Sequence, residues 1–236
     1  AAKELCKWKN NDEIIVPSLT WPTTVNPVMQ AGLKPVFVDT NFEDLSINYE
    51  DLKKKINKKT RRIFLAHILG FPSNINKVKK IIKGKKIRIF EDCCESHGAK
   101  IKNKKIGNFG TAASYSFYWA HHMTTIEGGM ITTNNFDFYN LCRIKRSHGF
   151  ARDLDKSLHK KIKKKYRDIN FNFLFLTDGF NLRSTNLNAF LGIRQLKKLN
   201  SFIKMRNTNY KKFINCLKPY KNNFHLVKYN DYNSMS

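Results

Sequence analysis

The sequence predicts an α/β fold in which helices sandwich a mostly parallel β-sheet. Short runs of β-branched and aromatic residues alternate along the chain with segments of helical spacing. The runs are apolar at consecutive positions, which is typical of strands that are buried on both faces. Alternation of such strands with helices favours a parallel sheet with helices on both sides. A hydrophobic content of 41% suits a chain that forms a globular core.

Six strands and three connecting helices are expected in the first part of the chain. The predicted strands are 12–18, 34–40, 61–68, 86–92, 112–118 and 128–134, and the predicted helices are 23–33, 49–56 and 75–83. In open α/β sheets, ligands bind beyond the carboxyl ends of the strands. The side chains that we expect there are Trp21, His67, Asp92 and those of the segment 116–122.

The second part of the chain is predicted to be helical and rich in lysine. Residues 156–165 are expected to form a solvated helix or loop, and 185–214 have the pattern of a long amphipathic helix. We therefore predict a large domain over 1–184, followed by a linker helix and the beginning of a smaller C-terminal α/β domain over 185–236. The chain has no initiating Met and ends soon after the long helix, so we expect a fragment of a longer protein.

The formal net charge of +26 is the most prominent feature of the composition. Only ten of the 44 basic residues are Arg, the side chain that usually reads bases and phosphates by paired hydrogen bonds. The excess of Lys accompanies abundant Asn and Ile, and all three are favoured by A/T-rich codons. We therefore predict no nucleic-acid partner, although a basic protein attracts polyanionic substrates such as nucleotides.

The sequence predicts a cytoplasmic protein without a membrane span. No run of about 18 apolar residues is present, and the N-terminus lacks an apolar signal region. The five cysteines are scattered, in neither a CxxC metal pattern nor the framework of a secreted disulfide protein. A reducing compartment and no metal site are the expectation.

The motif FEDCCESHG places acidic side chains at the end of a predicted strand. One interpretation of Asp92 is a solvated strand end or helix cap. The other is an acid that holds a cationic ring nitrogen or a metal, with Glu95 pointing into the same cleft. His97 is interpreted as a packing or hydrogen-bonding residue. Trp21 belongs either to the core or to a platform that stacks on a flat cofactor.

The segment SFYWAHHMTTIEGG contains two adjacent histidines before a glycine turn. Adjacent residues of an extended segment point in opposite directions, so His121 and His122 are poorly placed to bind one metal ion together with Glu127. The glycines suit a simple turn. The residues alone leave the histidines open between a catalytic and a merely polar role.

The order of the motifs resembles the DegT/StrS sugar-nucleotide aminotransferase family. The matching segments are VPSLTWPTT, AGLKPVFVDT, FEDCCESHGA, SYSFY, TTIEGGMITT and NLRSTNLNAFLGIRQLKKL. The resemblance covers residues 12–215 and implies the fold of type I enzymes that depend on pyridoxal phosphate (PLP). It implies that Trp21 stacks on the cofactor ring, that Asp92 pairs with the ring nitrogen, that Glu95 lies beside the ring, and that Ser116 contacts the phosphate.

The resemblance also implies a homodimer and a substrate-binding loop. Asn181 matches an asparagine that reaches the phosphate of the cofactor in the neighbouring subunit, so the active sites would be shared. His148, Arg152 and Arg183 lie in segments that the resemblance places near the substrate. His148 would hydrogen-bond the sugar, and the arginines would bind a phosphate or the carboxylate of glutamate.

Position 121 departs from the aminotransferase pattern. Members of the family with that activity carry a Lys there, which bonds covalently to the cofactor, and an imidazole cannot replace that bond. His121 can still act as a general base. The segment resembles the 3-dehydratase branch of the family, in particular the style that needs no iron–sulfur cluster, since the cysteines do not supply one.

The resemblance therefore implies a PLP/PMP-dependent 3-dehydratase (PMP is pyridoxamine phosphate) of lipopolysaccharide O-antigen deoxysugar biosynthesis. Its substrate would be a nucleotide-linked 4-keto-6-deoxyhexose similar to GDP-4-keto-6-deoxy-D-mannose. Glutamate would form PMP, and the product would be a 4-keto-3,6-dideoxy sugar. GDP and CDP both stay open as the nucleotide.

Three alternatives remain at this point. The first is a sugar-nucleotide aminotransferase in which the lysine has changed to histidine. The second is a basic binding module, which would show salt-sensitive nucleic-acid binding and no cofactor absorbance. The third is an inactive fragment, because the family's phosphate-binding loop lies upstream of the VPS strand.

Overall fold

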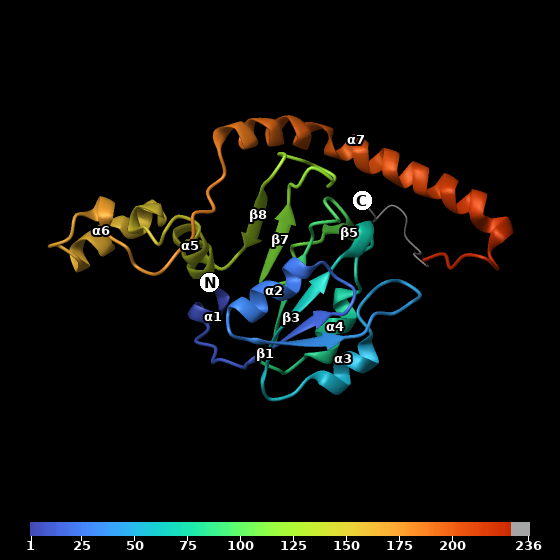
Figure 1. Cartoon of the computed structure of the whole chain (residues 1–236), viewed down its shortest axis with the longest axis horizontal. Coiled ribbons are helices and arrows are strands. Elements are labelled where there is room, and N and C mark those ends of the chain that lie inside the picture. The colour runs from blue at the N-terminus through green and yellow to red at the C-terminus, as the bar shows by residue number, and fades with distance from the viewer. Residues whose placement is uncertain (228–236) are drawn as a thin grey trace. The chain divides into compact units, whose positions relative to one another are not determined.

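The computed structural model describes residues 1–227, which form two compact units (Figure 1). The first, called the sheet unit, comprises Lys9–Thr132 and the described chain from Asn186 onward. The second, called the helical unit, comprises Ala1–Trp8 and Thr133–Thr185. The predicted domain boundary between residues 184 and 185 stays a prediction. Residues 228–236 lie outside the part of the chain that the structure describes.

All six predicted strands are confirmed, and they form one sheet of order β2-β1-β3-β4-β7-β8. Every pairing among the first five of these neighbours is parallel, and Figure 1 shows β8 running opposite to β7. The strands are β1 (Glu13–Pro17), β2 (Lys34–Val38), β3 (Thr60–Ala66), β4 (Arg88–Asp92), β7 (Ala112–Ser116) and β8 (Gly129–Thr133). The mostly parallel α/β fold is therefore confirmed.

Helices cover the sheet because its inner strand β1, which lies between β2 and β3, is buried on both faces. Every residue of β1 is buried, as its run of consecutive apolar residues predicts. The three predicted helices are present as α2 (Pro22–Gln30), α3 (Tyr49–Lys55) and α4 (Ile75–Ile81). Leu52 of α3 and Val78 of α4 pack with Ile15 and Ile63 in the main core cluster.

Asparagine side chains cap the N-termini of two of these helices. Asn48 accepts hydrogen bonds from the amides of Glu50 and Asp51, and Asn74 accepts one from Lys77. Such caps satisfy amides that have no partner within the helix. A short hairpin, β5 (Lys100–Ile101) with β6 (Lys104–Lys105), follows β4 and was not predicted.

The long amphipathic pattern forms a helix, α7 (Asn186–Leu217), followed by the 3₁₀ turn η4 (Lys218–Tyr220). None of its residues is buried. Its apolar side chains are therefore largely exposed, with Leu187 at 79% and Ile193 at 60%. The predicted helix is confirmed, whereas its role as a linker to a small domain stays a prediction.

The helical unit contains short helices joined by turns. They are α1 (Ala2–Leu5), α5 (Phe136–Lys145), η2 (Ala151–Asp153), α6 (Lys156–Lys165) and η3 (Phe171–Phe173). The lysine-rich segment is a helix without buried residues, which confirms that it is solvated. Within this unit, Lys145 forms ion pairs with Glu4 at 2.7 Å and with Asp178 at 2.8 Å.

Two further findings bear on the predicted cellular setting. Among the described residues, no helix is both long and apolar enough to cross a bilayer. The five cysteines are all free thiols in this structure. The cytoplasmic location itself stays a prediction.

Candidate active site

The candidate site lies at the carboxyl edge of the parallel strands. Because β1, β3, β4 and β7 run in the same direction, their carboxyl ends meet at one edge of the sheet. Asp92 ends β4, Ser116 ends β7, His67 follows β3, and Trp21 comes shortly after β1. The sheet unit thus brings together the predicted cofactor side chains that belong to it.

The carboxylate of Asp92 is held in one orientation. Its Oδ2 accepts a hydrogen bond of 2.8 Å from Thr24 Oγ1, and its Oδ1 accepts one of 3.1 Å from the Cys94 amide. Thr24 in turn accepts from Thr20 at 3.0 Å. A carboxylate has room for further donors beyond these two. Sequence reasoning missed Thr24, although the spacing of Thr20 and Thr24 by one helical turn in TWPTT is a signal that could have found it.

Trp21 combines a fixed backbone with an exposed side chain. It is the residue before α2, in an extended conformation, and Pro22 fixes the first position of the helix. Its side chain is 70% exposed. The core interpretation of Trp21 is therefore wrong, and a flat apolar ring is presented at the edge of the sheet.

Glu91 is a buried carboxylate that organises the loop before β7. Its two oxygens accept hydrogen bonds from the amides of Gly107, Phe109 and Gly110 at 2.7, 2.8 and 2.6 Å. His67 Nε2 lies 3.3 Å from the same carboxylate. Burial alone would raise the pKa of Glu91, but the bonds from His67 and the backbone amides hold this pKa below its ordinary value.

The neighbouring groups fix the tautomer of His67. Its Nδ1 accepts a hydrogen bond of 3.0 Å from the Ser73 amide, so the ring proton lies on Nε2 and is donated to Glu91. The Cys93 thiol completes a cluster whose potential ligand atoms lie within 4.8 Å of one another. Since hydrogen-bond donors already surround the carboxylate, the cluster is a structural hub of the fold.

Glu95 is tied to the loop that follows β3. Its Oε2 accepts a hydrogen bond of 2.9 Å from the amide of Leu69, a residue with a φ of 51°. This bond stabilises a left-handed backbone conformation that is uncommon for Leu. The role of Glu95 beside a cofactor ring stays a prediction.

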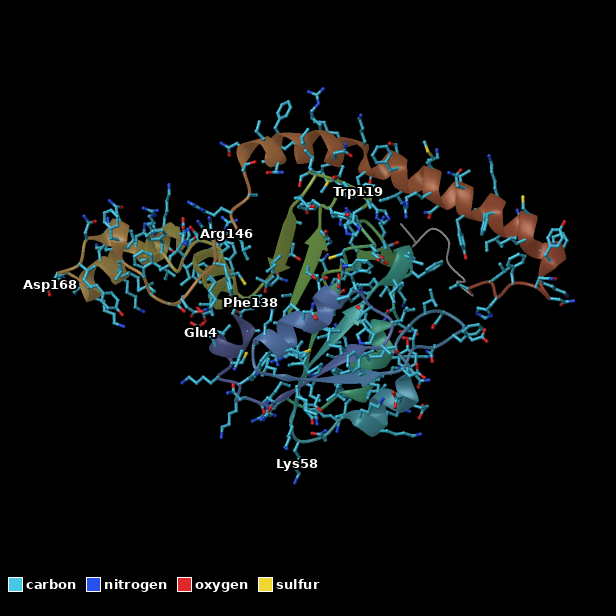
Figure 2. All side chains as sticks on the ribbon, viewed as in Figure 1. Glu4, Lys58, Trp119, Phe138, Arg146 and Asp168 are labelled. Atoms are coloured by element: carbon cyan, nitrogen blue, oxygen red, sulfur yellow. The ribbon has the colours of Figure 1, made fainter. Side chains whose placement is uncertain are left out.

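The segment between β7 and β8 is a closed loop rather than an extended strand. The carbonyl of Phe117 accepts from the Thr125 amide, and the Phe117 amide donates to the carbonyl of Gly128, both at 2.9 Å. Residues 119–123 form turns and bends, so the expected extended conformation there is wrong. Trp119 is 66% exposed within this loop (Figure 2). Ser116 accepts from the Tyr118 amide at 3.3 Å where the loop begins.

The glycine turn and α7 hold the end of this loop. Gly128 has a φ of 155°, and a Cβ there would lie 2.5 Å from Thr125 Oγ1, so a side chain would not fit. Asn188 of α7 donates hydrogen bonds to the carbonyls of Thr125 at 2.7 Å and Glu127 at 3.2 Å. Gly192 lies against Thr125, because a Cβ at Gly192 would be 3.0 Å from Thr125 Cγ2. The start of α7 therefore clamps the loop that carries His121.

The two adjacent histidines of the loop have different environments. His121 is half-buried, whereas His122 is 8% exposed. Both rings approach His97, with centroid separations of 6.2 Å for His121 and 5.6 Å for His122. Burial, together with His122 and His121, lowers the pKa of His97 to about 4, against a small opposing effect of the Ser116 backbone. His97 is buried, which agrees with its interpretation as a packing or hydrogen-bonding residue.

The remaining predicted residues belong to the helical unit. His148 and Asn181 lie on neighbouring segments, because the His148 amide donates to the Phe180 carbonyl at 2.8 Å and Ser147 forms a bridge with Asn181. The exposed Arg152 stacks over the Phe150 ring at 3.9 Å and donates to the Asn172 carbonyl. Arg183 and Asn181 are exposed. Their roles stay predictions.

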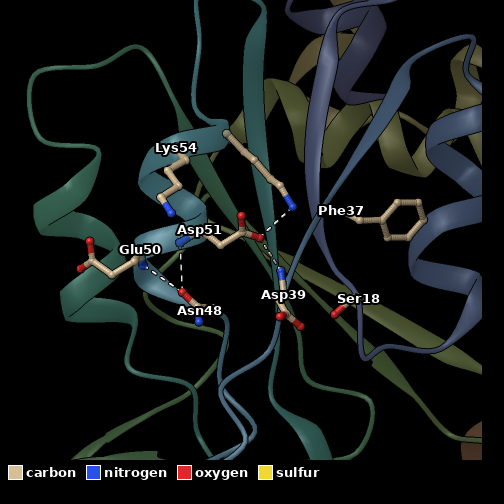
Figure 3. Close-up of a pocket in the computed structure, with 8 residues that line it drawn as sticks. Ser18, Phe37, Asp39, Asn48, Glu50, Asp51 and Lys54 are labelled. Atoms are coloured by element: carbon tan, nitrogen blue, oxygen red, sulfur yellow. Dashed lines mark hydrogen bonds and ion pairs between the residues drawn. The ribbon is translucent and has the colours of Figure 1, made fainter.

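A separate hollow of about 530 Å³ lies beside α3 and β2 (Figure 3). Its polar groups bond to one another: Asp51 accepts from the Asp39 amide at 2.8 Å and from Lys55 at 2.7 Å. None of the predicted site residues lines it. The hollow is therefore not the candidate active site.

Comparisons with known proteins agree with the motif order. The model of the DegT/DnrJ/EryC1/StrS aminotransferase family matches residues 2–235. A GDP-4-keto-6-deoxy-D-mannose 3-dehydratase of Yersinia pseudotuberculosis is 38% identical over 203 residues, which are 86% of this chain and 52% of the relative. A GDP-perosamine synthase of Escherichia coli is 33% identical over 209 residues, or 87% of this chain and 53% of that protein.

Solved structures give the same result. A mutant of GDP-4-keto-6-deoxymannose-3-dehydratase with bound GDP-perosamine superposes with a TM-score of 0.81 at 38% identity, covering 90% of this chain and 55% of that one. The Escherichia coli dehydratase with bound hydrated PLP has a TM-score of 0.80 at 35% identity and the same coverage. The chain thus spans about half the length of the relatives it matches. With nearly all of its residues matched by the family model, this chain belongs to the DegT/DnrJ/EryC1/StrS aminotransferase family.

Proposed function

We propose that this protein is a 3-dehydratase that depends on PLP and PMP and acts on a nucleotide-linked 4-keto-6-deoxyhexose. The observation that carries the proposal is His121, which occupies the position where aminotransferases of the family have the lysine that bonds to the cofactor. The similarity to two kinds of GDP-sugar enzyme supports a nucleotide-sugar substrate. GDP-4-keto-6-deoxy-D-mannose is the substrate we propose first, with a CDP-linked sugar as the alternative.

The residues at the sheet edge fit the cofactor. Asp92 keeps lone pairs available beyond its bonds to Thr24 and Cys94, so it can accept a hydrogen bond from a protonated ring nitrogen. The exposed indole of Trp21 offers a surface for stacking, and Ser116 offers a hydroxyl to the phosphate. When bound, PLP supplies an electron sink that stabilises a carbanion. Because the chain has no lysine at position 121, these non-covalent contacts have to hold the cofactor.

His121 is the general acid and base in this proposal. Its imidazole takes a proton from the C4′ carbon of the bound cofactor and delivers a proton to the oxygen on sugar C3, which leaves as water. The loop closed at Phe117 and Gly128 and clamped by Asn188 keeps the imidazole in place during both transfers. A half-buried ring suits this task, since it can reach a substrate without full exposure to water.

The overall reaction balances with glutamate as the reductant. Glutamate is oxidised to 2-oxoglutarate and releases its nitrogen as ammonia, while the C3–OH of the sugar becomes C3–H. The product is a 4-keto-3,6-dideoxy sugar that stays attached to its nucleotide. One glutamate is used for each deoxygenated sugar, and no other oxidant or reductant is required.

The segments around residues 148–152 and 181–183 carry the remaining predicted binding groups. We propose that His148 contacts the sugar and that Arg152 or Arg183 binds the carboxylate of glutamate or a phosphate. Stacking on Phe150 orients the guanidinium of Arg152 for such a contact. In this proposal Asn181 reaches the cofactor phosphate of a second copy of the chain, so the functional form is a homodimer. We also propose that the protein works in the cytoplasm.

The test is to incubate the protein with PLP, glutamate and GDP-4-keto-6-deoxymannose and to measure the mass of the nucleotide sugar. Loss of the C3 oxygen is expected in the wild type, and His121→Asn is expected to lower the rate by about a hundredfold or more. The matched control is His159→Asn, which changes a histidine of α6 and should leave the rate unchanged. A 4-amino sugar as the product would instead establish the aminotransferase, as the similarity to perosamine synthase would then suggest.

A further inference from the structure

His97 is surrounded by rings from β7 and from the loop 117–128, here called the histidine loop. Tyr115 and Phe117 each approach it with a centroid separation of 5.8 Å, and His121 and His122 approach it at 6.2 and 5.6 Å. These neighbours all belong to the segment from the end of β7 into the loop. The loop that carries His121 therefore folds around the imidazole of His97.

The polar atoms of His97 are not explained by packing alone. The residue is 3% exposed, and neither ring nitrogen makes a hydrogen bond of good geometry with the described residues, although the Ser116 backbone lies near enough to raise the pKa of His97 slightly. Burying such atoms without partners costs free energy, whereas a phenyl ring would fill the same space without that cost. The nitrogens of His97 therefore point to a polar partner in the loop, reached directly or through a water.

The Ser116 carbonyl can accept a hydrogen bond from one nitrogen of His97, which leaves the imidazoles of the loop as candidate donors to the other nitrogen. Phe117 has no polar atom, and the hydroxyl of Tyr115 donates to the carbonyl of Ile106 at 3.2 Å. Burial keeps His97 neutral near neutral pH, because its pKa is about 4. A neutral imidazole has one nitrogen that donates and one that accepts a hydrogen bond. The separation of 6.2 Å between the rings of His97 and His121 suits a small closing movement of the loop or one bridging water.

We propose that His97 is a positioning residue for His121. One nitrogen of His97, directly or through one water, accepts a hydrogen bond from His121 and fixes its tautomer. The other nitrogen of His121 then carries the lone pair that accepts the proton from the C4′ carbon of the bound cofactor. This assignment rests on the proposed role of His121. It explains why a buried histidine, and not an aromatic hydrocarbon ring, stands beneath the loop.

The first test reads the tautomer of His121 directly and needs no activity. Long-range proton–nitrogen NMR correlations of labelled histidine distinguish the two neutral tautomers, and His121→Asn assigns the His121 signals among the seven histidines. A single tautomer is expected in the wild type, and a mixture is expected in His97→Phe. His159→Phe, which removes a histidine of α6, is the matched control and should leave the His121 signals unchanged.

Three outcomes overturn the proposal. The first is a wild-type His121 that already averages both tautomers. The second is a His121 whose signals are the same in His97→Phe as in the wild type. The third is a tautomer change confined to His122, which would make His122 the partner of His97. If His97→Phe does not fold, His97→Gln, which keeps a polar amide, is expected to retain the single His121 tautomer, and a mixture in that folded variant also counts against the proposal.

The second test separates positioning from packing by kinetics. His97→Phe is expected to lower kcat for dehydration roughly tenfold to a hundredfold while KM stays within about twofold. His97→Gln is expected to recover part of the lost kcat. Equal kcat values in His97→Phe and the wild type would contradict the positioning role. A wild type that does not dehydrate the substrate would contradict the proposed function, while the NMR result would still judge His97.

Discussion

A single side chain separates the proposed chemistry from that of the aminotransferases in this family. A lysine amine at position 121 would bond covalently to the cofactor, whereas the imidazole of His121 can only exchange a proton. The bonds that close the loop are made by the Phe117, Thr125 and Gly128 backbone and by Asn188 of α7, and none of them uses the side chain at position 121. The chemistry of the site can therefore change without a change of fold.

The His121→Lys variant tests this distinction at the residue itself. The variant is expected to retain PLP through dialysis by a covalent bond, with a near-visible absorbance band, and to lose dehydration by about a hundredfold or more. Absorbance spectra after dialysis and the rate of loss of the C3 oxygen are the two measurements. Unchanged dehydration in this variant would show that His121 is not the acid and base.

The buried His97 predicts a specific acid sensitivity. Its pKa is about 4 in the folded protein, below the ordinary value of 6.5, because it is buried beside His122 and His121. Between these pH values the unfolded chain binds a proton that the folded chain does not bind. The free energy of unfolding should therefore fall as the pH drops from 6.5 to 4, by about 3 kcal/mol from this residue, and be unaffected above that window.

Urea unfolding of the wild type and His97→Phe over this pH range measures that contribution. The other titratable groups that face the ring, His121, His122 and Tyr115, are present in both proteins. The difference between the two curves thus isolates His97. If the free energies of unfolding of the wild type and His97→Phe changed in parallel with pH, His97 would gain a proton in the folded protein as readily as in the unfolded chain.

At the scale of elements, the hub at Glu91 connects three parts of the sheet unit. Glu91 belongs to β4, the strand that ends at Asp92, and its carboxylate accepts hydrogen bonds from amides of the loop 107–110 and from His67 beyond β3. Fixing the loop fixes the start of β7, and with it the loop that follows. The hub therefore supports the two strands that end at Asp92 and Ser116.

The Glu91→Gln variant should be strongly destabilised. An amide NH₂ would face backbone N–H groups that need an acceptor, so at least one buried donor would lose its partner, at a cost of about 3 kcal/mol. The measurement is the shift of the urea midpoint. Glu50→Gln on the exposed face of α3 is the matched control and should barely move the midpoint. A Glu91→Gln midpoint equal to that of the control would contradict the hub.

Local patterns predicted the elements well because each pattern reports a local cause. Consecutive apolar residues in EIIVP predicted a strand buried on both faces, and the spacing in 185–214 predicted the helix α7. The sequence did not reveal the pairing of Glu91 with His67 or of Thr24 with Asp92. Those partners are 24 and 68 residues apart, and only the folding of the sheet brings them together.

The histidine loop shows where reasoning along the chain fails. The sequence predicts an extended conformation for His121 and His122, but the bonds between Phe117, Thr125 and Gly128 close the segment that contains them into turns and bends. His121 and His122 therefore both approach His97, which adjacent residues of a strand would not do. The motif order still identified the family correctly, because it does not depend on the shape of the loop.

At the scale of the whole molecule, the central claim is that the protein removes oxygen from a sugar and does not aminate it. The most direct measurement follows the nitrogen of heavy-nitrogen-labelled glutamate during turnover of GDP-4-keto-6-deoxymannose. A dehydratase is expected to release the label as ammonia, in an amount equal to the 2-oxoglutarate formed, and not to place it in the nucleotide sugar. Label in the nucleotide sugar, with no labelled ammonia, would contradict the proposed dehydratase function.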